Sequence, residues 1–206
     1  MPSALILIDL QNDFCAGGAL AVPDSDAVIA VANHLMPHFS TVVVSQDAHP
    51  PDHGSFAANQ QGVEVGQMFE LNGLPQVAWP VHCVAGTPGA ELHKELSAAR
   101  ISKVVFKGTD PAIDSYSAFF DNGRRKSTGM AEWLREQKIE DLYIMGVATD
   151  FCVKFTVLDA LKEGFSVWLL EDGCRGVDLQ PGDSEQAISD MRAAGATIIW
   201  SGAITA

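Results

Sequence analysis

The chain has 206 residues, and 13 Lys and Arg against 26 Asp and Glu give it a formal net charge of −13. Nucleic-acid backbones and anionic membrane surfaces repel such an acidic protein, so we expect neither as its main partner. Hydrophobic residues make up 47% and charged residues 19%, which supplies a buried core and argues against disorder.

The N-terminal segment has no basic stretch, and its apolar run stops at Asp9. That run is shorter than the apolar region of a signal peptide and much shorter than a membrane helix, so we expect a cytoplasmic protein. The four cysteines lie far apart and form no Cys-x-x-Cys pair, which argues against a disulfide framework or a zinc ribbon.

Strand and helix patterns alternate along the first half of the chain. The continuously apolar run Ala4–Asp9 is typical of a strand buried on both faces. An apolar stripe at helical spacing predicts a helix at Asp24–Phe39, and Thr41–Gln46 is the next strand. The irregular segment Asp47–Thr87 is long enough to indicate a functional loop. A proline at its start favours a helix at Pro88–Ala99.

The alternation continues through the second half of the chain. In order, the predicted elements are a strand at Lys103–Lys107, an irregular stretch at Gly108–Ser127, a helix at Thr128–Gln137, a strand at Asp141–Gly146, a helix at Thr149–Glu163 ended by Gly164, a strand at Ser166–Glu171, a helix at Asp183–Ala194 and a strand at Thr197–Trp200.

This order predicts one doubly wound α/β domain over residues 1–206. Right-handed crossovers would join about six mainly parallel strands, with helices on both faces of the sheet. In such sheets the ligand crevice lies beyond the carboxyl ends of the strands.

Three polar residues follow strand ends and suggest nucleophilic chemistry. Asp9 ends the first strand, Lys107 ends the third, and Cys152 follows the fourth. With Thr149 as the N-cap, Cys152 falls in the first turn of a helix, where free N–H groups and a nearby Lys107 favour a thiolate. A thiol, a carboxylate and a cation at one sheet edge can cleave an acyl bond.

A second group of residues has the chemistry of a metal site. Asp47 and His49 alternate in an extended segment and so point to the same side. With His82 they would supply one carboxylate and two imidazoles, a set that suits zinc, Fe(II) or Mn(II), and His53 is a further candidate. Ordinary hydrogen bonding within a loop is the alternative interpretation of these residues.

Several motifs together resemble the isochorismatase-like cysteine hydrolases. They are Leu7-Ile8-Asp9-Leu10-Gln11-Asn12-Asp13-Phe14, Gln46-Asp47-Ala48-His49-Pro50, Trp79-Pro80-Val81-His82-Cys83, Lys107-Gly108 and Gly146-Val147-Ala148-Thr149-Asp150-Phe151-Cys152-Val153. The likeness runs from Leu5 to about Ala196, and the stretch 114–122 is similar to the nicotinamidase branch, also called pyrazinamidase. Ala48 departs from the aromatic residue that family members often carry there.

The resemblance implies roles for individual residues. Asp9, Lys107 and Cys152 would form a catalytic triad, and the backbone N–H groups of Ala148 and Cys152 an oxyanion hole after a cis peptide bond at Val147–Ala148.

The resemblance also implies how the substrate is held. Asp47, His49 and His82 would hold one divalent metal ion, with zinc expected and iron or manganese as alternatives. The ion would anchor the pyridine nitrogen of the substrate. Phe14 and Trp79 would flank the ring, and Tyr116 would line the pocket.

The implied reaction is hydrolysis of nicotinamide to nicotinate and ammonia, extending to pyrazinamide-like analogues, in NAD salvage. We expect a small-molecule substrate as partner, and a monomer or homodimer. A ureido or carbamoyl amidohydrolase, a non-haem Fe(II) oxygenase and a non-catalytic ligand-binding scaffold are the alternatives. A vinyl-ether-cleaving isochorismatase is disfavoured by the presence of Cys152.

Overall fold

The protein is described by a computed structural model over residues 2–204, so the ends of the predicted 1–206 domain lie outside the described residues. A six-stranded sheet has the order β5-β2-β1-β6-β7-β8, and every neighbouring pair is parallel. Its strands are β1 (Ser3–Ile8), β2 (Val42–Asp47), β5 (Lys103–Lys107), β6 (Asp141–Val147), β7 (Ser166–Arg175) and β8 (Thr197–Ile199). The predicted parallel α/β sheet is confirmed.

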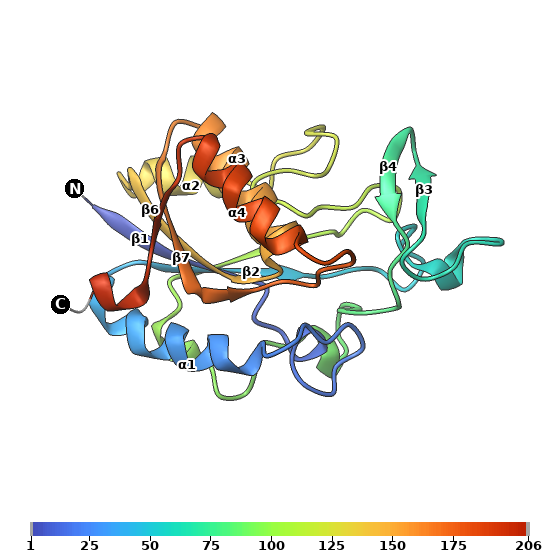
Figure 1. The fold of residues 1–206 in the computed structure, drawn as a ribbon, viewed down its shortest axis with the longest axis horizontal. Coiled ribbons are helices and arrows are strands. Elements are labelled where there is room, and N and C mark those ends of the chain that lie inside the picture. Colours follow the sequence, from blue (N-terminus) through green and yellow to red (C-terminus); the bar gives the residue numbers. More distant parts are fainter. Residues whose placement is uncertain (1, 205–206) are drawn as a thin grey trace.

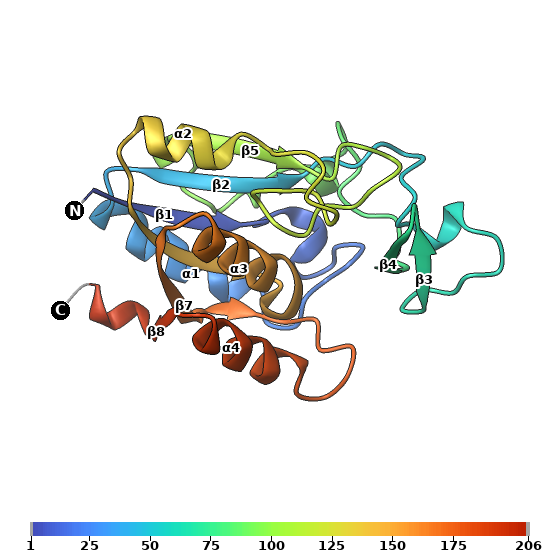
Figure 2. The ribbon, with the colours of Figure 1, turned by 90° about the horizontal axis from the view of Figure 1, so that it is seen from above.

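Helices cover both faces of this sheet. Helix α1 (Asp26–Leu35) lies on one face, and α2 (Met130–Glu136), α3 (Lys154–Lys162) and α4 (Asp183–Ala193) lie on the other (Figures 1 and 2). The fold is therefore doubly wound. None of the helices within residues 2–204 combines the length and apolarity needed to cross a bilayer.

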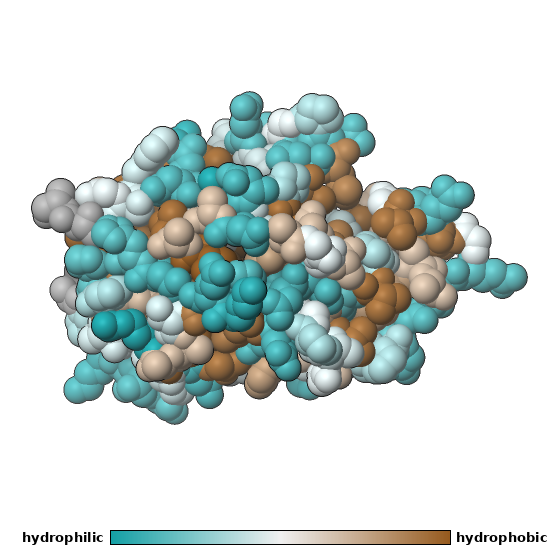
Figure 3. All heavy atoms as spheres, turned by 90° about the horizontal axis from the view of Figure 1, so that it is seen from below, coloured by the Kyte–Doolittle hydropathy of each residue, from teal (hydrophilic) through white to brown (hydrophobic). Residues whose placement is uncertain are grey.

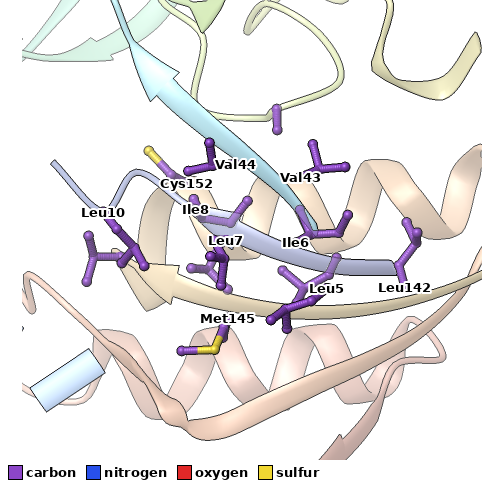
Figure 4. Close-up of a cluster of buried hydrophobic side chains, with 14 of the residues drawn as sticks. Leu5, Ile6, Leu7, Ile8, Leu10, Val43, Val44, Leu142, Met145 and Cys152 are labelled. Carbon is purple, nitrogen blue, oxygen red and sulfur yellow. The ribbon is translucent and has the colours of Figure 1, made fainter. Parts of the chain in front are cut away.

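The central strand explains the continuous apolar run near the N-terminus. Leu5, Ile6, Leu7 and Ile8 are all fully buried, because β1 is covered by helices from both sides. In Figure 4, Ile6 and Ile8 point to one side of the sheet, and Leu5 and Leu7 point to the other. On the α1 face of the molecule, hydrophobic residues form separate patches among hydrophilic ones (Figure 3).

The strand order reverses between β1 and β6, and this reversal creates the crevice. The chain runs from β1 outward to β2 and β5, whereas from β6 it runs the other way to β7 and β8. Ligand sites of doubly wound folds lie at this point. Gly146 permits the close approach of the two strands, because a Cβ there would lie 2.3 Å from the Ile8 carbonyl oxygen.

The predicted irregular segment Asp47–Thr87 contains a hairpin that the pattern did not predict. Strands β3 (Met68–Leu71) and β4 (Leu74–Val77) pair antiparallel, and Asn72 and Gly73 turn between them with φ of 52° and 81°. Such a turn matches the twist of the strands that it joins. The hairpin projects beyond the carboxyl ends of β2 and β5 (Figure 2).

The predicted helix at Pro88–Ala99 is wrong. Only two 3₁₀ turns form there, Pro88–Ala90 and Ala98–Arg100. Between them the backbone pairs with the loop after β1: Asn12 N–H donates to the Glu91 carbonyl, and His93 N–H donates to the Leu10 carbonyl. These long-range hydrogen bonds replace those that a helix would have made.

The predicted helix Thr149–Glu163 is also corrected at its start. Thr149–Val153 forms a π-helical turn before α3, and Ala148 rather than Thr149 is the N-cap. Cys152 therefore lies in a π turn, a feature often found at functional sites. Strand β7 is longer than predicted, and the remaining elements differ from prediction by a few residues at their ends.

Candidate active site

Asp9, Lys107 and Cys152 lie close together where the strand order reverses between β1 and β6. The Lys107 ammonium lies 2.8 Å from Asp9 Oδ2 and 3.4 Å from Cys152 Sγ. It also donates to the Ser115 carbonyl at 3.0 Å. All three of the residues predicted as a triad are at least nine-tenths buried. Figure 4 shows the sulfur beside the end of β1, near Ile8 and Val44.

Burial governs the ionisation of this trio. It raises the pKa of the Cys152 thiol well above its usual value, although the Lys107 ammonium opposes the rise. Desolvation of the thiolate thus acts against the cation beside it. Burial also raises the pKa of Asp9, while Lys107 and the Ser45 hydroxyl, which donates to Asp9 Oδ1 at 2.6 Å, lower it.

The backbone around the trio is unusual at two places. Asp9 has a φ of 52°, a conformation rare for a residue with a side chain, which redirects the chain at the end of β1. The Val147–Ala148 peptide bond is cis, as the resemblance implies. The Ala148 carbonyl accepts hydrogen bonds from the backbone N–H groups of Phe151 and Val153.

The predicted metal ligands form a buried cluster. Asp47 Oδ2 lies 3.6 Å from His49 Nε2 and 4.0 Å from His82 Nε2, and one donor atom of each residue lies within 4.8 Å of the other two. Asp47 Oδ1 lies 2.6 Å from Lys107 Nζ. The carboxylate of Asp47 therefore connects the predicted metal ligands to Lys107 of the predicted triad.

The tautomers of the two histidines suit a metal ion. His49 Nδ1 lies 2.8 Å from the Gly108 carbonyl, and His82 Nδ1 lies 2.8 Å from the Pro80 carbonyl. A carbonyl only accepts, so both Nδ1 atoms carry the proton and a neutral ring keeps its Nε2 lone pair toward Asp47. Burial lowers the pKa of His82 to about 4, which keeps that ring neutral near pH 7.

His53 lies beside this cluster with an unsatisfied nitrogen. Its ring centroid is 4.3 Å from that of His49, and its Nδ1 lies 2.7 Å from Ser55 Oγ. Its Nε2 is buried and has no hydrogen-bond partner among the described residues. A buried nitrogen of this kind fits a site completed by an ion or by ion-bound water.

A narrow pocket lies beside Cys152 and the predicted metal ligands. Its wall holds Cys152, Asp47, His49 and His82 together with apolar and aromatic side chains. The remaining lining residues are Phe14, Leu20, Trp79, Asp114, Tyr116, Phe151 and Val177. The three predicted ring-binding residues thus line the same pocket as the predicted nucleophile.

Hydrogen bonds between polar side chains hold two aromatic residues of the pocket, Trp79 and Tyr116, in place. The Tyr116 hydroxyl accepts hydrogen bonds from Trp79 Nε1 at 3.2 Å and from Gln76 Nε2 at 3.0 Å, and Gln76 Nε2 also donates to Asp114 at 2.9 Å. Gln76 belongs to β4, so the β3–β4 hairpin helps to position Tyr116 in the pocket. Burial raises the pKa of Tyr116 well above its usual value, so its hydroxyl stays protonated.

The residues predicted as the triad and as metal ligands lie close together in the structure, but several other residues that shape the site were not predicted. Phe151 directly precedes the proposed nucleophile, and Asp114 begins the nicotinamidase-like stretch, so both had a signal in the sequence. Gln11, Ser45 and Gln76 act through hydrogen bonds between distant segments. No local pattern marks such contacts.

The amino-acid sequence is similar to known proteins over nearly the whole chain. A model of the isochorismatase domain matches residues 3–201. The nicotinamidase of Escherichia coli (strain K12) is 55% identical over 201 residues, which cover 96% of this chain and 94% of that protein.

Solved structures of nicotinamidases and of a pyrazinamidase have the same fold as this chain. An Acinetobacter baumanii nicotinamidase/pyrazinamidase superposes with a TM-score of 0.95 at 43% identity, covering 98% of this chain and 97% of that one. The yeast nicotinamidase bound to the inhibitor nicotinaldehyde has a TM-score of 0.91 at 29% identity, with coverages of 96% and 99%. The Pyrococcus horikoshii pyrazinamidase in complex with zinc has a TM-score of 0.79 at 36% identity, with coverages of 97% and 99%. The chain therefore belongs to the isochorismatase family of hydrolases.

Proposed function

We propose that this protein is an amidohydrolase that converts nicotinamide to nicotinate and ammonia through a thioester on Cys152, and that it also accepts pyrazinamide-like analogues. The observation that carries the proposal is the position of Cys152 Sγ, 3.4 Å from Lys107 Nζ in a pocket that also holds the cluster of Asp47, His49 and His82. The reaction would serve NAD salvage.

The acylation step starts from a neutral thiol. Asp9 accepts the thiol proton as the sulfur attacks the carboxamide carbon, and Lys107 stabilises the charge that develops. The raised pKa of Asp9 makes it a stronger base than an exposed aspartate, which suits proton transfer from a thiol whose pKa is also raised. Asp9 then gives the proton to the departing nitrogen, and ammonia leaves.

The remaining steps use the same groups. The backbone N–H groups of Ala148 and Cys152 would stabilise the oxyanion. Water then attacks the nicotinoyl thioester and gives one proton to Asp9. The carbon–sulfur bond breaks and the proton on Asp9 returns to the sulfur of Cys152. Nicotinic acid leaves and gives its remaining proton to solvent to become nicotinate.

The chain's residues fit one divalent metal ion, with zinc expected and iron or manganese as alternatives. Asp47, His49 and His82 would hold it, and His53 is a further candidate. When bound, the ion supplies a Lewis-acid anchor for the pyridine nitrogen. Support comes from the contacts of His49 Nδ1 and His82 Nδ1 with backbone carbonyls, which leave both Nε2 atoms turned toward Asp47, and from the zinc complex of the Pyrococcus horikoshii relative.

Phe14, Trp79 and Tyr116 would position the substrate ring. Aromatic side chains favour stacked or edge-on contact with a planar heterocycle, and the buried hydroxyl of Tyr116 fixes the indole of Trp79. We further propose a cytoplasmic enzyme, a monomer or homodimer, whose partner is its small-molecule substrate. The net charge of −13 supports the exclusion of nucleic acid and anionic membranes.

Release of ammonia from nicotinamide tests the proposal directly. Wild-type protein should release ammonia with and without oxygen, and Cys152→Ala should lower turnover by more than about 10⁴-fold while still binding nicotinamide. The matched control is Cys174→Ala, which removes another buried cysteine that lies outside the pocket. Turnover retained by Cys152→Ala would overturn the thioester route, and dependence on oxygen would support an oxygenase instead.

A further inference from the structure

A second cluster of metal-binding side chains lies outside the pocket. One donor atom from each of Cys15, Asp26 and His93 lies within 4.8 Å of the other two. Cys15 follows the pocket residue Phe14, Asp26 begins α1, and His93 belongs to the segment that pairs with the loop after β1. The cluster thus joins three separate parts of the chain.

The donor types select a class of ligand. A thiolate, an imidazole and a carboxylate are the donors that zinc and similar borderline-soft divalent ions bind in proteins. Exposure falls from Asp26, which is exposed, through His93 to the buried Cys15, so an ion could enter from solvent and reach the sulfur. Asp26 Oδ1 accepts a hydrogen bond from the Ala16 backbone N–H at 3.3 Å.

The Ser25 hydroxyl is an independent sign of an incomplete polar site. Ser25 is 2% exposed, and its Oγ has no hydrogen-bond partner among the described residues. The same hydroxyl lies close enough to Cys15 to lower the pKa of the thiol. A buried hydroxyl beside a sulfur costs less free energy if the sulfur is a thiolate that accepts its proton.

Without a cation this site holds a neutral thiol. Burial, followed by the carboxylate of Asp26, raises the pKa of Cys15 to about 11. A divalent ion would bind Asp26 and displace the thiol proton, because coordination favours the thiolate far more than the surrounding protein disfavours it.

We propose that Cys15, Asp26 and His93 form a second divalent-cation site, for zinc or an ion of similar softness, separate from the site of Asp47, His49 and His82. Three protein donors leave a position for water, so the site would bind more weakly than a closed structural site. An ion here would tie the loop that carries Phe14 to α1 and to the segment around His93.

Cobalt(II) binding distinguishes this site from the one in the pocket. Thiolate coordination gives cobalt(II) a charge-transfer band in the near ultraviolet, and the proposed ligands in the pocket contain no sulfur. We would titrate the full chain carrying Cys152→Ala, which removes the only thiol in the pocket. The expected result is two ions per chain and a charge-transfer band that saturates with the second.

Variants assign the band to its ligands. Cys15→Ser should abolish it, and the surface changes Asp26→Asn and His93→Gln should each weaken the second binding event by about tenfold or more. Glu95→Gln, which removes an exposed charge near His93, and Cys174→Ser should leave it unchanged. One ion per chain without the band, or a band that survives Asp26→Asn and His93→Gln unchanged, would overturn the proposal. The two surface variants decide the matter even if Cys15→Ser does not fold.

Discussion

Gln11 exchanges two hydrogen bonds with the backbone of Asp47. Gln11 Nε2 donates to the Asp47 carbonyl at 2.8 Å, and the Asp47 N–H donates to Gln11 Oε1 at 2.8 Å. Gln11 Nε2 also donates to the Ala90 carbonyl. The loop after β1 thereby holds the last residue of β2, whose carboxylate joins Lys107 to the two histidines.

Gln11→Ala should therefore weaken metal binding, although Gln11 is not itself a predicted ligand. We expect zinc affinity to fall about 10–100-fold, because a positioning contact of a ligand is lost. The free energy of unfolding should fall by about 1–3 kcal/mol, because buried backbone groups lose their partners. Competition with a chromophoric chelator and urea unfolding measure the two effects. Gln46→Ala is the matched control, since Gln46 donates to Ala90 but makes no such bond to Asp47. Equal zinc affinities in the two variants would contradict the positioning role.

Ser45→Ala should move the acid limb of the pH–rate profile. The Ser45 hydroxyl stabilises ionised Asp9, so its loss raises the pKa of Asp9 further. The proposed attack needs ionised Asp9, and activity is lost as pH falls through that pKa. We therefore expect the acid limb of kcat/KM to shift upward by about one pH unit, the size of one hydrogen bond to a charged group. A profile that stays in place, or moves to lower pH, would show that Asp9 is not the titrating base.

Removal of the metal should weaken substrate capture but spare the thiol. In the proposed mechanism Asp9 accepts the thiol proton and Lys107 stabilises the thiolate, and protein contacts alone hold both beside Cys152, so iodoacetamide should still alkylate the sulfur after chelation. Turnover at low nicotinamide concentration should fall about 100-fold or more, because the ring nitrogen loses its anchor, and added zinc should restore it. Peptide mass spectrometry follows alkylation at Cys152. Full activity in stripped protein would rule out the anchoring role.

Tyr116→Phe should raise KM more than it lowers kcat. The change deletes the hydroxyl that accepts from Trp79 and Gln76, and leaves two buried donors without that partner. At about 1 kcal/mol for a lost hydrogen bond, KM should rise about fivefold. Steady-state kinetics with nicotinamide provide the test. Tyr143→Phe is the control, because Tyr143 stacks on Trp168 away from the pocket. A loss confined to kcat would indicate that Tyr116 takes part in the chemistry itself.

The six strands of the sheet could be predicted because their signal is local. A strand such as β1, covered on both faces, needs apolar residues at every position, so its composition alone identifies it. The positions of Asp9 and Lys107 at strand ends followed from the same pattern. The rule that parallel strands present their carboxyl ends at one edge then brought these residues together.

The hairpin in the predicted irregular segment and the predicted helix at Pro88–Ala99 were missed for different reasons. The β3–β4 hairpin carries a local signal, Asn72-Gly73 between apolar residues, that the search for longer patterns missed. The segment Pro88–Ala99 has helical features, yet the backbone of its middle part forms hydrogen bonds with Leu10 and Asn12, far away in the chain. Long-range pairing overrides local propensity, which contributes only a fraction of a kcal/mol per residue.

Local patterns in the chain were enough to predict the sheet, the edge at which the proposed chemistry lies, and the residue types that meet there. The behaviour of those groups depends on the folded arrangement. It buries Cys152, which raises the pKa of the thiol beside Lys107. It also places the carboxylate of Asp47 between Lys107 and the two histidines, and it turns two imidazole nitrogens toward that carboxylate. The reason is physical: ionisation and ligand geometry depend on desolvation and on contacts between segments far apart in the chain, which appear only when the chain has folded.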